Sequence, residues 1–166
     1  MTTSSAKPER HLISALVENK PGVLARIASL FSARGFNIES LNVGETDKPQ
    51  YSRMTITVSG DTQIIEQVRK QLEKLIDTLK VTELTDADCV ERDLALIKVK
   101  VPAAKRSEFR DLVDIFNARI VDIGDKHMIV ELAANERKIE TFINLATPFG
   151  ISEMVRAGRI ALKRGV

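Results

Sequence analysis

One pattern of apolar and polar residues occurs twice along this chain, and this repetition restricts the possible folds more than any other feature. The first copy contains four short β-forming runs, at residues 11–17, 36–43, 54–59 and 79–84. Between them, apolar residues recur every three or four positions, which predicts two amphipathic helices: one with Val23, Leu24, Ile27, Leu30 and Phe31, the other with Ile64, Ile65, Val68, Leu72, Leu75 and Ile76. The predicted order of elements is βαββαβ.

The second copy follows a polar segment at residues 86–92, which we interpret as a linker. Its strands are predicted at residues 94–101, 119–123 and 127–132, with one or two closing strands at 151–155 and 159–162. Its helices carry Phe109, Leu112, Val113 and Phe116, and then Ile139, Phe142, Ile143 and Ala146. Two copies of this order predict an α+β chain with two ferredoxin-like domains, each a four-stranded antiparallel sheet covered by two helices on one face. The predicted boundaries are a disordered tail at 1–10 and domains at 11–85 and 93–166.

The first predicted strand has apolar residues on both of its sides. Leu12 and Leu16 point to one side, and Ile13, Ala15 and Val17 to the other, because successive residues of a strand face in opposite directions. The helices cover only one face of such a sheet, so the second apolar side is most easily buried against another copy of the chain. We therefore expect self-association.

The charge and composition weigh against several classes of function. Lys and Arg number 25 and Asp and Glu 23, so the net charge of +2 gives no electrostatic basis for binding nucleic acid or an anionic membrane. Aromatic residues make up only 4% of the chain, whereas a nucleic-acid binder on a ferredoxin-like sheet needs exposed aromatics. No apolar run approaches the roughly 18 residues that span a bilayer. The single cysteine, Cys89, excludes a disulfide within the chain, so we expect a reducing, cytoplasmic location.

No arrangement of residues in the sequence points to a catalytic or metal site. His11 and His127 have no neighbour at the spacing of a metal-ligand pair, so structural or surface roles are favoured for both. Cys89 would act as a nucleophile only if the fold brought a histidine to it. The linker region carries four carboxylates, which we interpret as part of a solvated loop: Asp86, Asp88, Glu91 and Asp93. The sequence contains no glycine-rich phosphate-binding loop.

The segment NKPGVL at residues 19–24 joins the first predicted strand to the first helix and allows two interpretations. In the structural one, Asn, Pro and Gly are simply residues that suit a tight turn and the start of a helix. In the functional one, Gly22 exposes backbone N–H groups at the helix start to the α-carboxylate of an amino acid. Asn19, which has both a donor and an acceptor, would then meet the α-ammonium group.

Residues outside this turn extend the functional hypothesis. Asn37 follows the first helix, and we expect its side chain near the same end of the sheet. The apolar side chains of Val23, Leu24 and Ile38 are expected to receive an aliphatic ligand side chain. Together these positions predict a small pocket for an amino acid.

Three motifs closely resemble those of a known family: NKPGVL at 19–24, FSARGFNIESL at 31–41 and SRMTI at 52–56. The likeness continues through QLEKLI at 71–76 and RDLALIKV at 92–99, and covers essentially residues 11–166. The family is the small regulatory subunit of acetolactate synthase, also called acetohydroxyacid synthase. The first motif by itself marks any ACT domain, whereas its combination with the other two is specific to this family.

This resemblance implies a regulatory subunit in branched-chain amino acid biosynthesis rather than an enzyme. Such a subunit activates a separate large catalytic subunit and confers feedback inhibition by valine, which binds between two ACT domains dimerised side by side. Carried over by position, the effector-binding residues are Asn19, Pro21, Gly22, Val23 and Leu24 of one copy, with Asn37 and Ile38 of the other. Thiamine diphosphate, Mg²⁺ and FAD are implied only for the large subunit, and no cofactor or metal for this one.

The second copy of the pattern differs where the first has its turn. Residues 101–104 read VPAA and lack both Asn and Gly, so we expect no amino acid to bind there in the same way. We expect this domain to support the dimer or contact the large subunit, and the hairpin at 46–52 is a further candidate contact. Two other classes stay open: an enzyme whose catalytic groups are assembled by the fold, and a nucleic-acid binder. A transcriptional regulator would need a helix-turn-helix segment, and no stretch remains for one.

Overall fold

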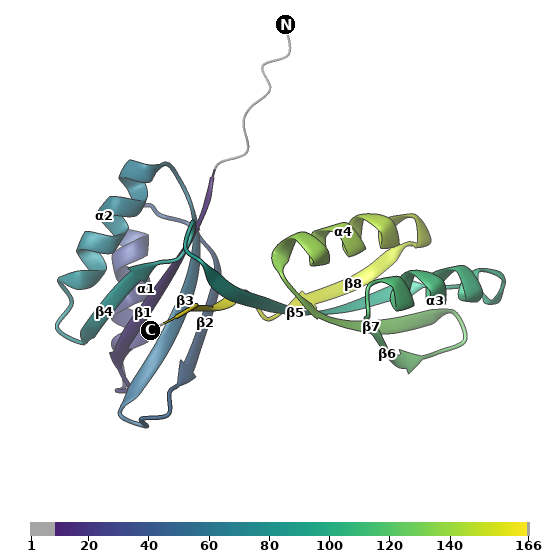
Figure 1. The fold of residues 1–166 in the computed structure, drawn as a ribbon, viewed down its shortest axis with the longest axis horizontal. Helices are drawn as coiled ribbons and strands as arrows, with labels where there is room; N and C mark the ends of the chain where they lie inside the picture. Colours follow the sequence, from purple (N-terminus) through teal and green to yellow (C-terminus); the bar gives the residue numbers. More distant parts are fainter. Residues whose placement is uncertain (1–8, 166) are drawn as a thin grey trace, which may run out of the picture. The chain divides into compact units, whose positions relative to one another are not determined.

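The computed structural model describes residues 9–165, which fold as two compact units (Figure 1). The first unit holds the chain up to Val90 and the stretch from Ala161 onward, and the second holds Glu91–Ile160. The tail predicted at 1–10 lies almost entirely outside the described residues, and Arg10 already belongs to the first strand. In the described part of the chain, no helix is both long and apolar enough to cross a membrane.

The first unit has the predicted βαββαβ order. Its elements are β1 (Arg10–Glu18), α1 (Val23–Ala33), β2 (Ile38–Glu45), β3 (Tyr51–Ser59), α2 (Thr62–Glu73) and β4 (Thr78–Glu83). The strands form an antiparallel sheet in the order β2-β3-β1-β4, which leaves β2 and β4 at its edges. Both helices pack their apolar stripes on one face of this sheet, against the inward residues of β1 and β3: Ile13, Ala15, Val17, Met54, Ile56 and Val58.

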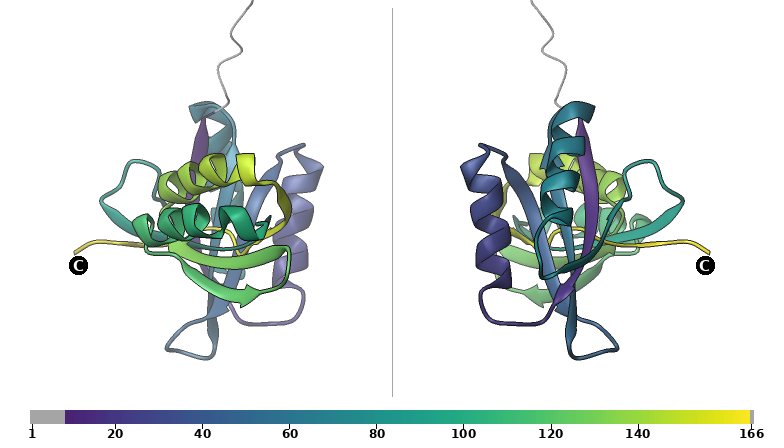
Figure 2. Two further views of the ribbon diagram at one scale, coloured as in Figure 1. Left: turned by 90° about the vertical axis from the view of Figure 1, so that its right-hand side faces the viewer. Right: turned by 90° about the vertical axis from the view of Figure 1, so that its left-hand side faces the viewer.

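The second unit repeats this architecture. Its elements are η1 (Ala103–Lys105), α3 (Arg106–Ile115), β6 (Arg119–Ile123), β7 (His127–Ala134), α4 (Glu136–Ala146), η2 (Thr147–Phe149) and β8 (Ile151–Arg156). Strand β5 (Cys89–Lys100) starts at the end of the first unit and continues into the second. The sheet runs β6-β7-β5-β8, with a last strand β9 (Ile160–Lys163) paired to β5. Helices α3 and α4 lie together on one face of the sheet (Figure 2), where Phe109 and Phe142 are fully buried. The predicted fold class, two ferredoxin-like α+β domains, is therefore confirmed.

The structure differs from the sequence prediction at the boundary between the two copies. The segment 86–92 was predicted as a linker, but β5 begins at Cys89. The strand was missed because its first residues are mostly charged. Asp93, interpreted as part of a solvated loop, is only 3% exposed. The Asp93 carboxylate accepts hydrogen bonds from Arg156 Nε at 2.8 Å and from the backbone N–H of Gly158 at 3.0 Å. A charge neutralised in this way can occupy an inward strand position that the sequence pattern assigns to an apolar residue.

Two further boundaries, the end of α2 and the end of the second unit, also differ from the sequence prediction. Helix α2 ends at Glu73, so Leu75 and Ile76 do not extend its apolar stripe, and Ile76 is 95% exposed. Residues from Ala161 onward, predicted to belong to the second domain, pack within the first unit instead. There Ala161 forms a small apolar cluster with Leu12 and Leu84.

This cluster changes the interpretation of the outer side of β1. We expected Leu12 to be buried by a second copy of the chain. Instead it is 1% exposed, because Ala161 and Leu84 cover it within the same chain. The cover is held in place by backbone hydrogen bonds, from Leu84 N–H to Leu12 O at 2.7 Å and from Arg164 N–H to Asp88 O at 2.8 Å. At this end of β1, no second copy is needed to bury the outer side.

Replacing Ala161 with aspartate should therefore destabilise the first unit, although the sequence pattern assigns this residue to the second. Ala161 is 6% exposed, and a carboxylate there would be desolvated against Leu12 and Leu84, lowering the free energy of unfolding by about 2–3 kcal/mol. Leu162 is 64% exposed, so the same change at the next residue should cost less than about 0.5 kcal/mol. Chemical denaturation of both variants measures the difference, and equal losses would show that the cluster contributes nothing.

Candidate functional site

The turn between β1 and α1 leaves the start of the helix open. Gly22 occupies the N-cap position with a φ of 85°, a left-handed conformation that favours glycine, and no side chain caps the first turn. The first N–H groups of a helix have no partner within the helix and carry partial positive charge. Pro21 and Gly22 are both exposed, so this end of α1 can accept an anionic group from solvent.

Asn19 is held beside this helix start by the β2–β3 hairpin. Its backbone N–H donates to Gln50 O at 2.8 Å, and its Nδ2 group donates to Pro49 O at 2.9 Å and to Glu45 Oε2 at 3.3 Å. The two N–H bonds of the amide are thus both engaged within the chain. A cation can use the Oδ1 acceptor without displacing either contact, and the Glu45 carboxylate adds negative charge nearby.

A second charged pair lies on the other side of the turn. Arg26 donates from Nε to Asp77 Oδ2 at 2.8 Å, and its Nη2 lies 2.6 Å from the same oxygen. A Cβ atom added at Gly22 would lie 3.6 Å from Arg26 Nη1, so the guanidinium borders the open helix start. Within the turn, the hydrogen bond to Glu18 raises the pKa of Lys20, which stays cationic at neutral pH. The turn thus carries positive charge at its helix side and negative charge around Asn19.

Sequence reasoning missed Glu45 and Arg26. Arg26 had a usable signal, because it follows Gly22 by four residues and so lies one helical turn away on the same face of α1. Glu45 had none, because its place beside Asn19 depends on how the β2–β3 hairpin folds over β1.

The two apolar candidates at the start of α1 have different roles. Val23 is 4% exposed and packs in the core of the first unit, so its side chain is not free to meet a ligand, contrary to the sequence prediction. Leu24 is 47% exposed and presents its side chain to solvent next to the turn. Of this pair, only Leu24 can line an aliphatic pocket.

Asn37 and Ile38 lie at the opposite end of the first sheet from the turn. Ile38 pairs with Val58, and Val58 pairs with His11 near the start of β1, whereas the turn follows the last residue of β1. The strand between these ends is roughly 23 Å long at the usual rise per residue. The expectation that Asn37 lies near the turn within one chain is therefore wrong. The reason is that α1 runs back along the sheet, so the residues after it begin β2 at the far end.

His11 and Cys89 have structural surroundings. His11 is 4% exposed, with Nδ1 3.2 Å from Glu83 Oε1 and Nε2 3.2 Å from Gly60 O. Cys89 donates weakly from Sγ to Leu84 O at 3.8 Å. Within residues 9–165, no group of three or more His, Cys, Asp and Glu side chains is placed to hold a metal ion.

Known proteins similar to this chain decide its family. Residues 13–80 match the family model of the AHAS small subunit-like ACT domain, and residues 92–165 match that of the small subunit of acetolactate synthase. A probable acetolactate synthase small subunit from Archaeoglobus fulgidus is 53% identical over 156 residues, covering 94% of this chain and 98% of that protein. The chain belongs to the acetolactate synthase small-subunit family.

Other members agree with this placement. The acetolactate synthase small subunit of Mycobacterium bovis is 48% identical over 158 residues, covering 95% of this chain and 94% of that protein. The crystal structure of the small subunit from Thermotoga maritima superposes with a TM-score of 0.82 at 43% identity, covering 95% of this chain and 99% of that one. Membership of this family assigns the chain a regulatory role with an ACT domain as its first unit.

In the present chain, the turn of the second unit lacks the polar side chain that Asn19 supplies in the first. Val101 stands where the first unit has Asn19, and its backbone N–H donates to Lys126 O at 3.0 Å, just as that of Asn19 donates to Gln50 O. The Val101 side chain is fully buried, so it offers no polar group to a ligand. The structure thus adds a packing reason to the sequence difference at this turn.

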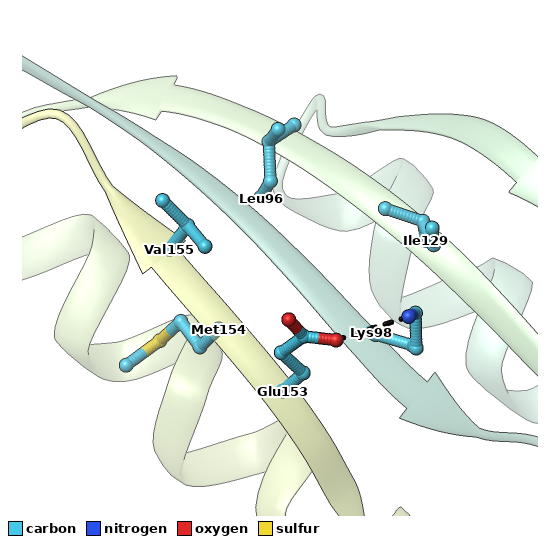
Figure 3. Close-up of a pocket in the computed structure, with 6 residues that line it drawn as sticks. All are labelled: Leu96, Lys98, Ile129, Glu153, Met154 and Val155. Carbon is cyan, nitrogen blue, oxygen red and sulfur yellow. Dashed lines mark hydrogen bonds and ion pairs between the residues drawn. The ribbon is translucent and has the colours of Figure 1, made fainter.

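The second sheet of the present chain has an open face that carries aliphatic side chains. Leu96 and Val155 are 40% and 60% exposed, and with Ile129 they lie on this face around a shallow hollow of about 170 Å³ (Figure 3). An ion pair of 3.0 Å between Lys98 Nζ and Glu153 Oε2 crosses it. The residues that line this hollow include no aromatic ring on which a base could stack, so it offers no support for the nucleic-acid alternative.

Proposed function

We propose that this chain activates the large catalytic subunit of acetolactate synthase and confers feedback inhibition by valine bound at an interface between two ACT domains. The observation that carries this proposal is the separation of charge around one turn. The open start of α1 at Gly22 suits a carboxylate, and the Asn19 acceptor beside Glu45 suits an ammonium group. A free α-amino acid carries these two groups on adjacent atoms.

The proposed pose follows from these contacts. The carboxylate of valine accepts hydrogen bonds from the first N–H groups of α1 and gains from the nearby Arg26 guanidinium. The ammonium group donates to Asn19 Oδ1 and faces the Glu45 carboxylate. The isopropyl group lies toward Leu24, the exposed apolar side chain next to the turn. A branched aliphatic side chain fits this role better than a charged one.

A second copy supplies the remaining residues. Strand β2 is an edge of the first sheet, a position that can pair with a strand of another chain, and its Val43 residue is 45% exposed. If two β2 strands pair in antiparallel fashion about a two-fold axis, the start of one lies opposite the end of the other. Asn37 and Ile38 of one copy then lie at the end of the sheet where the other copy has its turn. This arrangement explains why one chain does not bring these residues together.

Regulation then follows from linked equilibria. Valine that binds residues of two chains stabilises one arrangement of the dimer over another, and the catalytic subunit responds to that arrangement. Couplings of this kind are typically worth about 1–3 kcal/mol, or roughly 5- to 150-fold in affinity. The β2–β3 hairpin at residues 46–52 is a candidate contact with the catalytic subunit, since it is anchored to Asn19 through Pro49 and Gln50.

The proposal also divides the chemistry between the subunits. Thiamine diphosphate, Mg²⁺ and FAD are assigned to the large subunit, and this chain contributes no catalytic group. The expected location is the cytoplasm, where the catalytic subunit works.

Titration of valine into a mixture of this chain and its catalytic subunit tests the function. Acetolactate formation should rise when the chain is added, because it stabilises the active form, and should then fall severalfold as valine is added. The catalytic subunit alone and this chain alone are the controls, and only the first should form acetolactate. If acetolactate formation by the catalytic subunit changes neither with this chain nor with valine, the proposal is refuted. Acetolactate formed by this chain alone would favour the enzyme alternative.

A further inference from the structure

The second unit has a basic hollow at the end of its sheet that corresponds to the candidate effector site of the first unit. The hollow has a volume of about 710 Å³ and lies where β5, β7 and β8 meet the β6–β7 turn. Its polar lining consists of Lys98, Lys100, Asp125, Lys126, His127 and Ser152. The proposed effector, valine, does not use this end of the second unit.

Hydrogen bonds and strand registers fix which residues of the two units correspond. Glu18 lies opposite Tyr51, and Lys100 lies opposite His127, at the same position of the two central strand pairs. The backbone N–H of Glu18 donates to Asp77 O at 2.8 Å, and that of Lys100 donates to Gly150 O at 2.8 Å. Glu18 therefore corresponds to Lys100, and Asp77 to Gly150. By the hydrogen bonds of Asn19 and Val101, Gln50 corresponds to Lys126.

This correspondence reveals a reversal of charge. In the first unit these positions hold two carboxylates and an amide, those of Glu18, Asp77 and Gln50. In the second unit they hold two lysines and a glycine, Lys100, Lys126 and Gly150. The first arrangement balances charge around a turn and suits an amino acid, which is itself a zwitterion. The second concentrates ammonium groups and removes the buried carboxylate, so its natural complement is an anion.

The lysines of the hollow are available to a ligand. Lys98 is already paired with Glu153, but within residues 9–165 neither Lys100 nor Lys126 has an ion-pair partner, and both side chains are exposed. Asp125 is the one carboxylate of the lining, and its backbone oxygen and that of Gly124 each accept a hydrogen bond from Arg106 Nη2 at 2.8 Å. This guanidinium adds positive charge at the turn. The Ser152 hydroxyl offers a neutral donor.

We infer that this hollow binds a small polyanion with at least two phosphate groups. A single exposed ion pair is weak, so a monovalent carboxylate gains little here. A diphosphate meets Lys100 and Lys126 together, and hydrogen bonds between charged partners are the stronger kind. The inference goes beyond the proposed valine response and does not depend on it, because the two sites lie in different units and share no residue.

Calorimetric titration of the full chain with inorganic pyrophosphate at low salt tests this site. The Lys100→Gln, Lys126→Gln double variant should bind pyrophosphate about tenfold more weakly or worse, because both charge-assisted contacts are lost. The matched control is Lys74→Gln, Lys80→Gln in the first unit, which removes the same net charge from two exposed lysines. That variant should stay within about twofold of the unaltered chain, since long-range effects of surface charges are screened.

A second measurement locates the ligand without relying on a variant. Pyrophosphate should protect Lys100 and Lys126, but not Lys74 and Lys80, from acetylation detected by mass spectrometry. Inorganic phosphate should protect the same two lysines more weakly, because it carries less negative charge and fewer acceptor oxygens. Absence of pyrophosphate binding, or equal weakening in the two double variants, would overturn the inference and leave only general attraction to a positive surface.

Discussion

Replacing Gly22 with aspartate is expected to abolish inhibition by valine while leaving activation of the catalytic subunit intact. The new carboxylate would lie at the open start of α1, where the carboxylate of the effector is proposed to bind, and would occupy the same N–H groups. It would also attract the nearby Arg26 guanidinium, which an added Cβ approaches to 3.6 Å. The valine concentration for half inhibition should rise by about 100-fold or more, the upper range of such couplings. Steady-state acetolactate assays with the catalytic subunit measure it.

The Gly22→Ala variant separates this charge effect from backbone strain. Gly22 has a φ of 85°, so any side chain there costs about 1 kcal/mol in stability, with or without a carboxylate. Alanine should therefore share the lower stability of the aspartate variant but keep most of its response to valine. If aspartate at this position leaves the inhibition curve unchanged, the proposed site is refuted. If alanine is as insensitive as aspartate, backbone geometry rather than charge controls the response.

Removing the Asp93 carboxylate should strongly destabilise the second unit. The Asp93 side chain is 1% exposed and lies 2.6 Å from Arg156 Nη2, whose side chain is 25% exposed. Burial opposes the charge of Arg156, but its hydrogen bonds to Asp93 and Glu140 raise the pKa above the usual value for arginine. The Asp93→Ala variant leaves the Gly158 N–H without its acceptor and leaves Arg156 with only the more exposed Glu140 carboxylate. The free energy of unfolding should fall by about 3 kcal/mol, measured by chemical denaturation.

The control for this prediction is the other carboxylate on the same guanidinium. Glu140 lies 2.5 Å from Arg156 Nη1 but is 44% exposed, so solvent screens the pair. The Glu140→Gln variant should cost less than about 1 kcal/mol. Similar losses from the two variants would mean that the buried position of Asp93 has no special weight.

The sequence predicted most of the fold because the fold depends on patterns that are local. Alternation in the run at 54–59 and the helical spacing of Ile65, Val68 and Leu72 each specify one element and its buried face. The apolar residues of the run, Met54, Ile56 and Val58, and the three helix residues all lie in the core of the first unit. The start of β5 was missed because Asp93 is buried by a contact with Arg156, far away in the sequence, and no local pattern records such a pair.

The candidate site was predicted only where it is continuous in the sequence. The turn from Asn19 to Gly22 is a single segment, and the structure places it at the open start of α1 as expected. Glu45 and Asp77 reach the same region from a hairpin and from the loop before β4, so their contribution depends on tertiary structure. The misplacement of Asn37 has the same origin, since its position depends on the direction in which α1 crosses the sheet.

The cluster of Leu12, Leu84 and Ala161 also has a consequence for the order in which the chain can fold during synthesis. Leu12 is among the first described residues to be made, whereas Ala161 follows only after the whole of the second unit. Until then, a first unit that has already formed its sheet and helices still shows Leu12 and Leu84 to solvent. A ribosome-bound chain should therefore carry an apolar patch that chaperones can recognise. Any excised first domain that ends before residue 161 should keep that patch permanently.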